Sequence, residues 1–241
     1  MCGRYAVQQD PAALAGEFEA VDRAEGLLGP DYNVTPTKTV PIVVERATGS
    51  GPERSLRPVR WGLVPTWAQD PDSGPPMINA RAETITTKPA YAESAARRRC
   101  LMPATGWYEW RPGERRKQPY LCSRGDGTSL AMAAVFSAWW SPDNTTPLVT
   151  CAVVTTAAVG EFAAVHHRMP LVLPRQKWAQ WLDQTRTDVD ELLAPDVRAL
   201  DELELTAVSS EVNNMRNNHP ALLEPAEPAP EPAQQGALFE S

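Results

Sequence analysis

Short strand-like runs recur along most of the chain and constrain its fold more than any other feature. Runs rich in β-branched and aromatic residues lie at 40–46, 55–60, 77–81, 99–102, 106–110, 119–123, 130–138, 148–155, 170–173 and 203–209. Helical patterns fit at 10–20, 84–97, 157–164, 174–183 and 188–194. Because strands and helices do not alternate regularly, the pattern does not indicate a parallel β-α-β sheet. The sequence predicts an α+β fold with a largely antiparallel, barrel-like β core and peripheral helices.

The composition of the chain changes near residue 220. The 241 residues are 42% hydrophobic, which is enough to bury one large core. The last residues, in contrast, repeat Pro, Glu and Ala, and such a segment cannot bury enough apolar surface to offset the entropy lost on ordering. We therefore expect one domain over residues 1–220 and a disordered acidic tail over residues 221–241.

Charge is distributed unevenly along the chain. The formal net charge is −7, but residues 183–205 contain eight Asp or Glu against two Arg, and residues 221–241 contain four Glu and no basic residue. Residues 1–182 carry a net +3, and their arginines fall in aromatic-rich segments. Arginine with aromatic rings suits phosphates and unpaired bases, although it is also common surface packing. We expect the rings of Trp61 and Trp67 to be partly buried.

The sequence shows neither a sorting signal nor a metal motif. No apolar run reaches the roughly 20 residues of a membrane span, and the N-terminus lacks a signal-peptide pattern. The four cysteines, Cys2, Cys100, Cys122 and Cys151, show no CxxC spacing. We expect a cytoplasmic protein with reduced thiols, three of them in strands, and with no metal or other cofactor.

Cys2 directly follows Met1. Methionine aminopeptidase removes a leading methionine when the next residue is small, which would leave Cys2 with a free α-amine and a thiol. The α-amine has a pKa of roughly 7.7–8.0, and we expect the ammonium to lower the thiol pKa from its usual value of about 8.5. Such a 1,2-aminothiol condenses with an aldehyde to a five-membered thiazolidine. The alternative is that residue 2 is a cysteine by accident and frays in solvent, as most chain termini do, since free cysteine is more often a small hydrophobe than a catalyst.

Two strand segments carry polar residues among apolar ones. Asn79 and Arg81 are two residues apart, so in a strand they project to the same side. Glu109 lies among aromatic residues, where desolvation raises the pKa of a carboxyl toward the range that a general acid or base needs. Each segment also fits an ordinary strand, with Arg81 in solvent at its end and Glu109 packed along rings at a sheet edge.

Two of the three histidines are adjacent, in the run His166-His167-Arg168. Histidine titrates close to neutral pH and commonly transfers protons. Adjacent histidines lack the spacing of zinc ligands, and no cysteine pair accompanies them. We therefore favour a proton-transfer role for this run, with a structural histidine at a helix end as the alternative.

Taken together, the motifs resemble the SRAP family, the SOS-response-associated peptidase-like or abasic site processing proteins. The matching segments follow the family order and are CGRY at 2–5, YNVTPT at 32–37, RWGLVPTWA at 60–68, INARAET at 78–84, RCLMPATGWYEW at 99–110, QPY at 118–120 and HHRMPLVL at 166–173. They cover nearly all of the predicted domain.

The resemblance implies that Cys2 forms a thiazolidine with the ring-opened aldehyde of an abasic site in single-stranded DNA. The resulting covalent DNA–protein cross-link would protect the lesion during the DNA damage response. The resemblance also implies that Asn79 and Glu109 position and deprotonate the Cys2 amine and handle the proton exchange of imine formation. His166 would donate a proton either for sugar ring opening or for the departure of the sugar hydroxyl. The DNA-binding residues that it implies are Arg4, Arg81 and Arg168 at phosphates and Trp67 on a neighbouring base.

Further expectations follow from the same resemblance. We expect the protein to remove its own Met1 in a peptidase-like reaction. We also expect a monomer that associates with the nucleoid when it engages DNA. Replication-fork proteins are candidate partners, and the sequence does not identify which. The chain departs from the family at His167, where an acidic residue is usual. A second imidazole would lower the pKa of His166 by repulsion when both are protonated.

Two other classes of function remain open from the residues. Glutaminase-like N-terminal-nucleophile amidohydrolases also begin Met-Cys-Gly and use the thiol against an amide, but this chain has no acceptor or synthetase domain. Release of ammonia from glutamine would identify that class. The other class is a non-catalytic single-stranded DNA-binding module, whose binding would reverse fully in denaturant.

Overall fold

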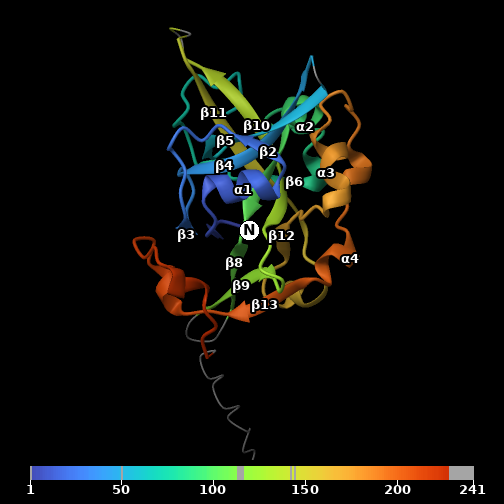
Figure 1. The fold of residues 1–241 in the computed structure, drawn as a ribbon. Coiled ribbons are helices and arrows are strands. Elements are labelled where there is room, and N and C mark those ends of the chain that lie inside the picture. The colour runs from blue at the N-terminus through green and yellow to red at the C-terminus, as the bar shows by residue number, and fades with distance from the viewer. Residues whose placement is uncertain (1, 50, 113–116, 142, 144, 228–241) are drawn as a thin grey trace, which may run out of the picture.

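A closed five-stranded barrel forms the centre of the protein (Figure 1). The computed structural model describes residues 2–49, 51–112, 117–141, 143 and 145–227. Around the barrel, the strands are β5 (Gly51–Trp61), β4 (Thr39–Thr48), β7 (Arg99–Ala104), β10 (Leu130–Trp140) and β11 (Pro147–Ala157). Neighbours are antiparallel except β11 and β5, whose parallel pairing places Cys151 opposite Trp61 and closes the barrel. The predicted antiparallel, barrel-like core is confirmed.

A second, antiparallel sheet packs beside the barrel. Its strands, in order, are β13 (Leu203–Ala207), β9 (Gln118–Arg124), β8 (Gly106–Arg111), β1 (Tyr5–Val7) and β3 (Asp31–Val34). Only Thr105 separates β7 from β8, so the chain passes directly from the barrel into this sheet. A Cβ atom at Gly106 would lie 2.5 Å from the carbonyl oxygen of Cys122, so this close crossing requires glycine.

Three short strands extend the barrel sheet. They are β2 (Ala20–Asp22), which pairs with β5, and β6 (Asn79–Arg81) and β12 (Arg168–Pro170), which both pair with β11. At the C-terminal end of β11, Thr155 pairs with Arg81 on one edge and with Pro170 on the other. The end of β11 therefore lies between two segments that are far apart in the sequence.

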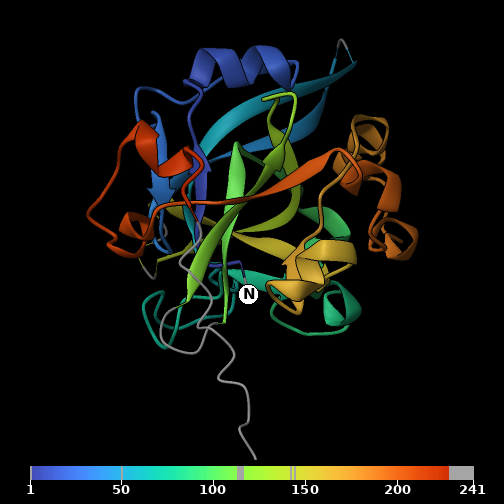
Figure 2. The ribbon, with the colours of Figure 1, turned by 90° about the horizontal axis from the view of Figure 1, so that it is seen from below.

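Helices are short and surround the strands (Figures 1 and 2). The α-helices are α1 (Pro11–Glu17), α2 (Ala92–Arg97), α3 (Arg175–Leu182) and α4 (Val197–Leu200), and the 3-10 helices are η1 (Ala82–Thr84), η2 (Gly160–Ala164), η3 (Asp190–Leu192), η4 (Ser210–Asn213) and η5 (Pro220–Leu223). The predicted cap of the first helix is confirmed, because the Asp10 carboxylate accepts a hydrogen bond of 2.8 Å from the Ala13 amide. A helix was expected over 84–97, but only its C-terminal part, Ala92–Arg97, forms the α-helix α2. Among the described residues, none of these helices is long and apolar enough to cross a membrane.

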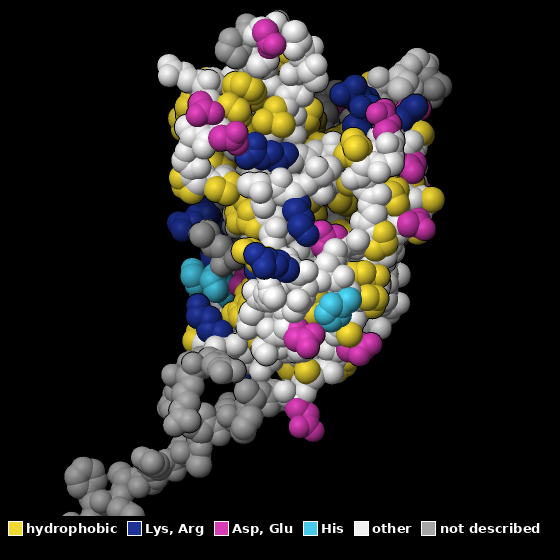
Figure 3. Space-filling view, turned by 90° about the vertical axis from the view of Figure 1, so that its left-hand side faces the viewer, with side chains coloured by type: hydrophobic (Ala, Val, Ile, Leu, Met, Phe, Trp, Pro, Cys, Tyr) yellow, Lys and Arg dark blue, Asp and Glu magenta, His cyan; other side chains and the backbone are white. Residues whose placement is uncertain are grey.

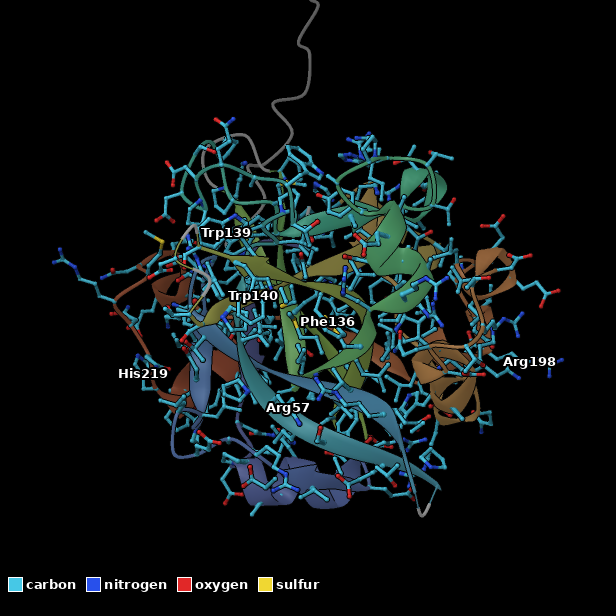
Figure 4. The ribbon with its side chains drawn as sticks, turned by 90° about the horizontal axis from the view of Figure 1, so that it is seen from above. Arg57, Phe136, Trp139, Trp140, Arg198 and His219 are labelled. Atoms are coloured by element: carbon cyan, nitrogen blue, oxygen red, sulfur yellow. The ribbon has the colours of Figure 1, made fainter. Side chains whose placement is uncertain are left out.

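The chain after β12 crosses the molecule. Figure 2 shows β13 running between α4 and η4, and Figure 4 places Arg198 and His219 at opposite edges of the view, with Phe136 near its middle. Beyond β13, Leu222 is fully buried, and the amide of Ala226 donates to the carbonyl of Ala207 at 2.8 Å. Apolar leucines thus hold the chain on the domain past the boundary expected at residue 220. The rest of the predicted tail, residues 228–241, lies outside the described residues.

Candidate functional site

Cys2 lies in the core directly before β1. It has no exposed surface, and the pairing of Tyr5 with Trp107 on β8 carries the chain in toward Glu109. From β6, the Asn79 side-chain amide donates a hydrogen bond of 2.9 Å to the carbonyl oxygen of Cys2. The side-chain oxygen of Asn79, Oδ1, is buried and has no hydrogen-bond partner among the described residues. The structure therefore brings together Cys2, Asn79 and Glu109, which sequence reasoning had grouped.

The ionisation of Cys2 and Glu109 follows from their burial. Glu109 is 6% exposed, and burial raises its pKa to about 7, which confirms the sequence-based expectation. Burial also raises the pKa of the Cys2 thiol, and the nearby charge of Glu109 raises it further. The expectation of a lowered thiol pKa is therefore wrong for this structure, because the low-dielectric surroundings disfavour the thiolate more than nearby positive charge favours it. All four cysteines are buried free thiols, and three lie in strands as predicted.

His166 follows η2, and its ring is held by the backbone of Arg168. The Arg168 amide donates to Nδ1 at 3.0 Å, and the Arg168 carbonyl oxygen lies 3.1 Å from the same nitrogen. The pKa of His166 is lowered, as expected, but the leading cause is burial rather than His167. The repulsion between the two imidazoles instead lowers the pKa of His167, which is exposed. The two ring centres are 4.3 Å apart.

Glu109 and His166 line one cleft of about 1000 Å³. Arg4, Trp110 and Lys117 share its walls, and the C-terminal residues between β13 and Glu227 close one side. Cys2 lies beneath this cleft, next to Glu109, rather than on its surface.

Arg4 is positioned by residues that sequence reasoning did not connect with it. Its NH1 group donates to Asn33 Oδ1 at 2.7 Å and to the carbonyl of Val212 at 2.8 Å, and its guanidinium lies 5.6 Å from the ring centre of Trp110. Asn33 is fully buried, and its amide donates in turn to three carbonyls of the segment 212–217. The polar residues of both segments were visible in the sequence, but only the fold shows that Asn33 on β3 meets the segment 212–217.

Arg81 and Arg168 flank the end of β11 and differ in surroundings. Arg81 is exposed, and Ala80 beside it is buried, as strand alternation predicts. Arg168 is held by protein acceptors: it donates to both carboxylate oxygens of Glu83, at 2.6 and 3.0 Å, and to the carbonyl of Thr155 at 2.6 Å. Of these two arginines, Arg81 is the one that is open to an approaching phosphate.

The two tryptophans expected to be partly buried take different positions. Trp61 ends β5, is fully buried, and packs its ring at 5.3 Å from Tyr5. Trp67 is 66% exposed, so the expectation is wrong for this residue. It lies in the irregular segment after β5, beside a smaller cavity of about 180 Å³, and not in the cleft with Glu109 and His166. Its ring is available for stacking at some distance from Cys2.

The surface charge varies over the molecule. Figure 3 shows Lys and Arg side chains running down the middle of one face with hydrophobic side chains between them, while most Asp and Glu side chains lie nearer its top and bottom. In the part of the chain that the structure describes, no three His, Cys, Asp or Glu side chains are grouped so that they could hold a metal ion.

Comparison with known proteins places this arrangement in a family. The chain is 34% identical to the abasic site processing protein YoqW of Bacillus subtilis (strain 168) over 230 residues, which cover 93% of this chain and 99% of that protein. It is 29% identical to the abasic site processing protein HMCES of Gallus gallus over 264 residues, which cover 94% of this chain and 78% of that protein.

Solved structures agree with the fold. A crystal structure of a protein from Bacteroides thetaiotaomicron, 22% identical, superposes with a TM-score of 0.81 over 93% of this chain and 100% of that one. A phage-related protein from Bordetella bronchiseptica, 28% identical, gives a TM-score of 0.64 over 87% of this chain and 95% of that one. The profile of the family described as SOS response associated peptidase (SRAP) matches residues 1–215. The chain therefore belongs to the SRAP family.

Proposed function

We propose that this protein processes abasic sites in single-stranded DNA by covalent capture at Cys2 after removal of Met1. The observation that carries the proposal is a buried Cys2, whose carbonyl is held by Asn79, next to a Glu109 with a pKa of about 7 that lines one cleft together with His166. The names of relatives such as YoqW and HMCES, abasic site processing proteins, support the choice of lesion.

The proposed chemistry joins one aldehyde to two nucleophiles. The α-amine nitrogen of Cys2 attacks C1′ of the ring-opened sugar to give a carbinolamine, which loses water to form an imine. The thiol sulfur then adds to the same carbon, and its proton passes to the nitrogen. Aldehyde and aminothiol thus give a thiazolidine and one water, with no oxidation or reduction.

The ionisation of the site favours attack by the amine before the sulfur. Burial raises the pKa of the Cys2 thiol, so the thiolate is scarce, whereas an α-amine titrates near pH 8. Glu109, with a pKa of about 7, can accept a proton from the ammonium in neutral solution. His166 exchanges protons with the sugar as its ring opens and water leaves. Asn79 fixes the Cys2 backbone, and hence the direction of both nucleophiles.

The fold contributes by holding the reacting groups in place. Once removal of Met1 opens access to Cys2, a DNA strand bound over the cleft would bring C1′ within reach of a preset aminothiol, and such positioning is worth up to roughly 7–11 kcal/mol of barrier. Arg4 on the cleft wall and the exposed Arg81 are suited to the flanking phosphates, and the exposed Trp67 to a neighbouring base. Removal of Met1, by an aminopeptidase or by the protein itself, is part of the proposal.

Intact mass spectrometry with a defined oligonucleotide tests this function. Mature protein lacking Met1 is mixed with a single strand that carries one abasic site. We expect a species whose mass is that of protein plus DNA less one water, stable in denaturant. A strand whose abasic aldehyde has been reduced to the alcohol, and the variant Cys2→Ala, should give none. An equal yield of adduct with either control would show that another nucleophile or another chemistry is at work.

A further inference from the structure

Glu83 lies outside the residues discussed for the reaction, yet it joins the two segments that carry them. It belongs to η1, directly after β6, and its carboxylate faces Arg168 on β12. The contact is a two-pronged ion pair, with NH1 to Oε1 at 2.6 Å and NH2 to Oε2 at 3.0 Å. Such paired geometry fixes orientation as well as distance.

The Arg168 side chain is nearly enclosed. It is 11% exposed, whereas the side chain of Glu83 is 50% exposed. Its NH2 group also donates to the carbonyl of Thr155 on β11, and its Nε is buried with no hydrogen-bond partner among the described residues. The contacts with Glu83 and Thr155 are therefore what hold the guanidinium, and they tie β6, β11 and β12 together where these strands meet.

The same arginine holds His166 through its backbone. Its amide nitrogen and its carbonyl oxygen both lie within hydrogen-bond distance of Nδ1, at 3.0 and 3.1 Å. Whether Nδ1 accepts or donates, the backbone of Arg168 occupies this nitrogen and so fixes one side of the ring. The direction of the ring thus depends on where the backbone of Arg168 lies.

We propose that Glu83 is a positioning residue for His166: by clamping the Arg168 side chain it fixes the backbone that orients the imidazole toward the cleft. The inference rests on the proposed function, because it assigns His166 a proton exchange during capture of the lesion. It also gives Arg168 a positioning role in addition to the phosphate contact expected from the sequence, since NH1 and NH2 both bond to protein acceptors.

The variant Glu83→Gln tests the proposal, with Glu202→Gln as a matched control. Glu202 forms an ion pair of 2.6 Å with Arg124, and its side chain is 58% exposed, so the control removes a comparable surface carboxylate that is not at the cleft. We expect Glu83→Gln to slow adduct formation at saturating protein by roughly tenfold, part of the roughly 10²- to 10⁴-fold that general acid–base catalysis supplies. Affinity for a strand carrying a tetrahydrofuran abasic analogue, which has no aldehyde, should not fall. The control should change neither quantity.

A second readout does not depend on the reaction. In the DNA-free protein, nitrogen NMR of the histidine rings should show changed His166 ring-nitrogen signals in Glu83→Gln, with those of His219 unchanged. Unchanged His166 signals, an unchanged rate, or a loss of analogue affinity as large as the loss of rate would each overturn the proposal. If the wild-type protein formed no adduct at all, the proposed function would fail, while the NMR comparison would still decide the role of Glu83.

Discussion

Replacing Glu109 by Gln should remove a pH-dependent loss of stability from the folded protein. The carboxyl is 6% exposed, and burial raises its pKa from an ordinary 4.5 to about 7. A group whose pKa is higher in the folded than in the unfolded state stabilises the fold fully below the unfolded value, and this contribution is lost as the pH rises through the folded value. The wild-type protein should therefore lose stability, relative to Glu109→Gln, between about pH 4.5 and pH 8.

The size of the effect follows from the shift in pKa. At 1.36 kcal/mol for each pKa unit, a rise from 4.5 to about 7 corresponds to about 3 kcal/mol of unfolding free energy. Urea unfolding of both proteins across this pH range measures the difference, and titrating groups that do not interact with Glu109 cancel because both proteins share them. The exposed Glu53 on β5 provides the control, since Glu53→Gln should show no comparable trend.

A flat difference between wild type and Glu109→Gln from pH 5 to pH 8 would refute this reasoning. It would mean that Glu109 ionises in the folded protein as easily as in the unfolded chain. The carboxyl could then not serve as the base with a pKa near neutrality that the proposed amine attack requires.

Three further changes have definite expected outcomes. Arg81→Ala should weaken binding to single-stranded DNA and reduce the slope of log affinity against log salt by roughly 0.7, the value for one phosphate contact on a single strand, as measured by fluorescence anisotropy. Trp67→Ala should weaken binding by roughly 1–3 kcal/mol if its exposed ring stacks on a base, and should leave the thermal midpoint unchanged. Arg99 is fully buried and donates to the carbonyls of Ala95, Ala96, Trp181, Asp183 and Arg186. Arg99→Met leaves these carbonyls without a donor and should therefore lower the unfolding free energy by several kcal/mol.

The strands β4, β10 and β11 could be predicted because each contains a run of β-branched and apolar residues, whereas β5 is interrupted by charged residues and proline and was predicted only over 55–60. The short strands β1, β2 and β3 could not be predicted. Tyr5–Val7, for example, is three residues long and forms only because β3 and β8 lie on either side of it. Pairing of this kind depends on tertiary context, which outweighs local propensity in so short a segment.

The family resemblance named the members of the candidate site, but neither the burial of Cys2 nor its raised thiol pKa was predicted. A carboxylate among aromatic residues was enough to predict the raised pKa of Glu109. The burial of Cys2 was not predictable, because a residue next to the chain start is usually exposed. The pair of Glu83 and Arg168 joins positions 85 residues apart and lacks any local signal. Only the strand register at the end of β11 brings the two side chains together.

The most direct test of the account locates the covalent bond itself. Mature protein is reacted with a single-stranded oligonucleotide carrying one abasic site, both protein and DNA are digested, and the cross-linked peptide is sequenced by tandem mass spectrometry. We expect the sugar remnant on the N-terminal peptide, joined to both nitrogen and sulfur of Cys2. A remnant on a lysine side chain, or on the Cys2 amine with the thiol still free to alkylate, would contradict it.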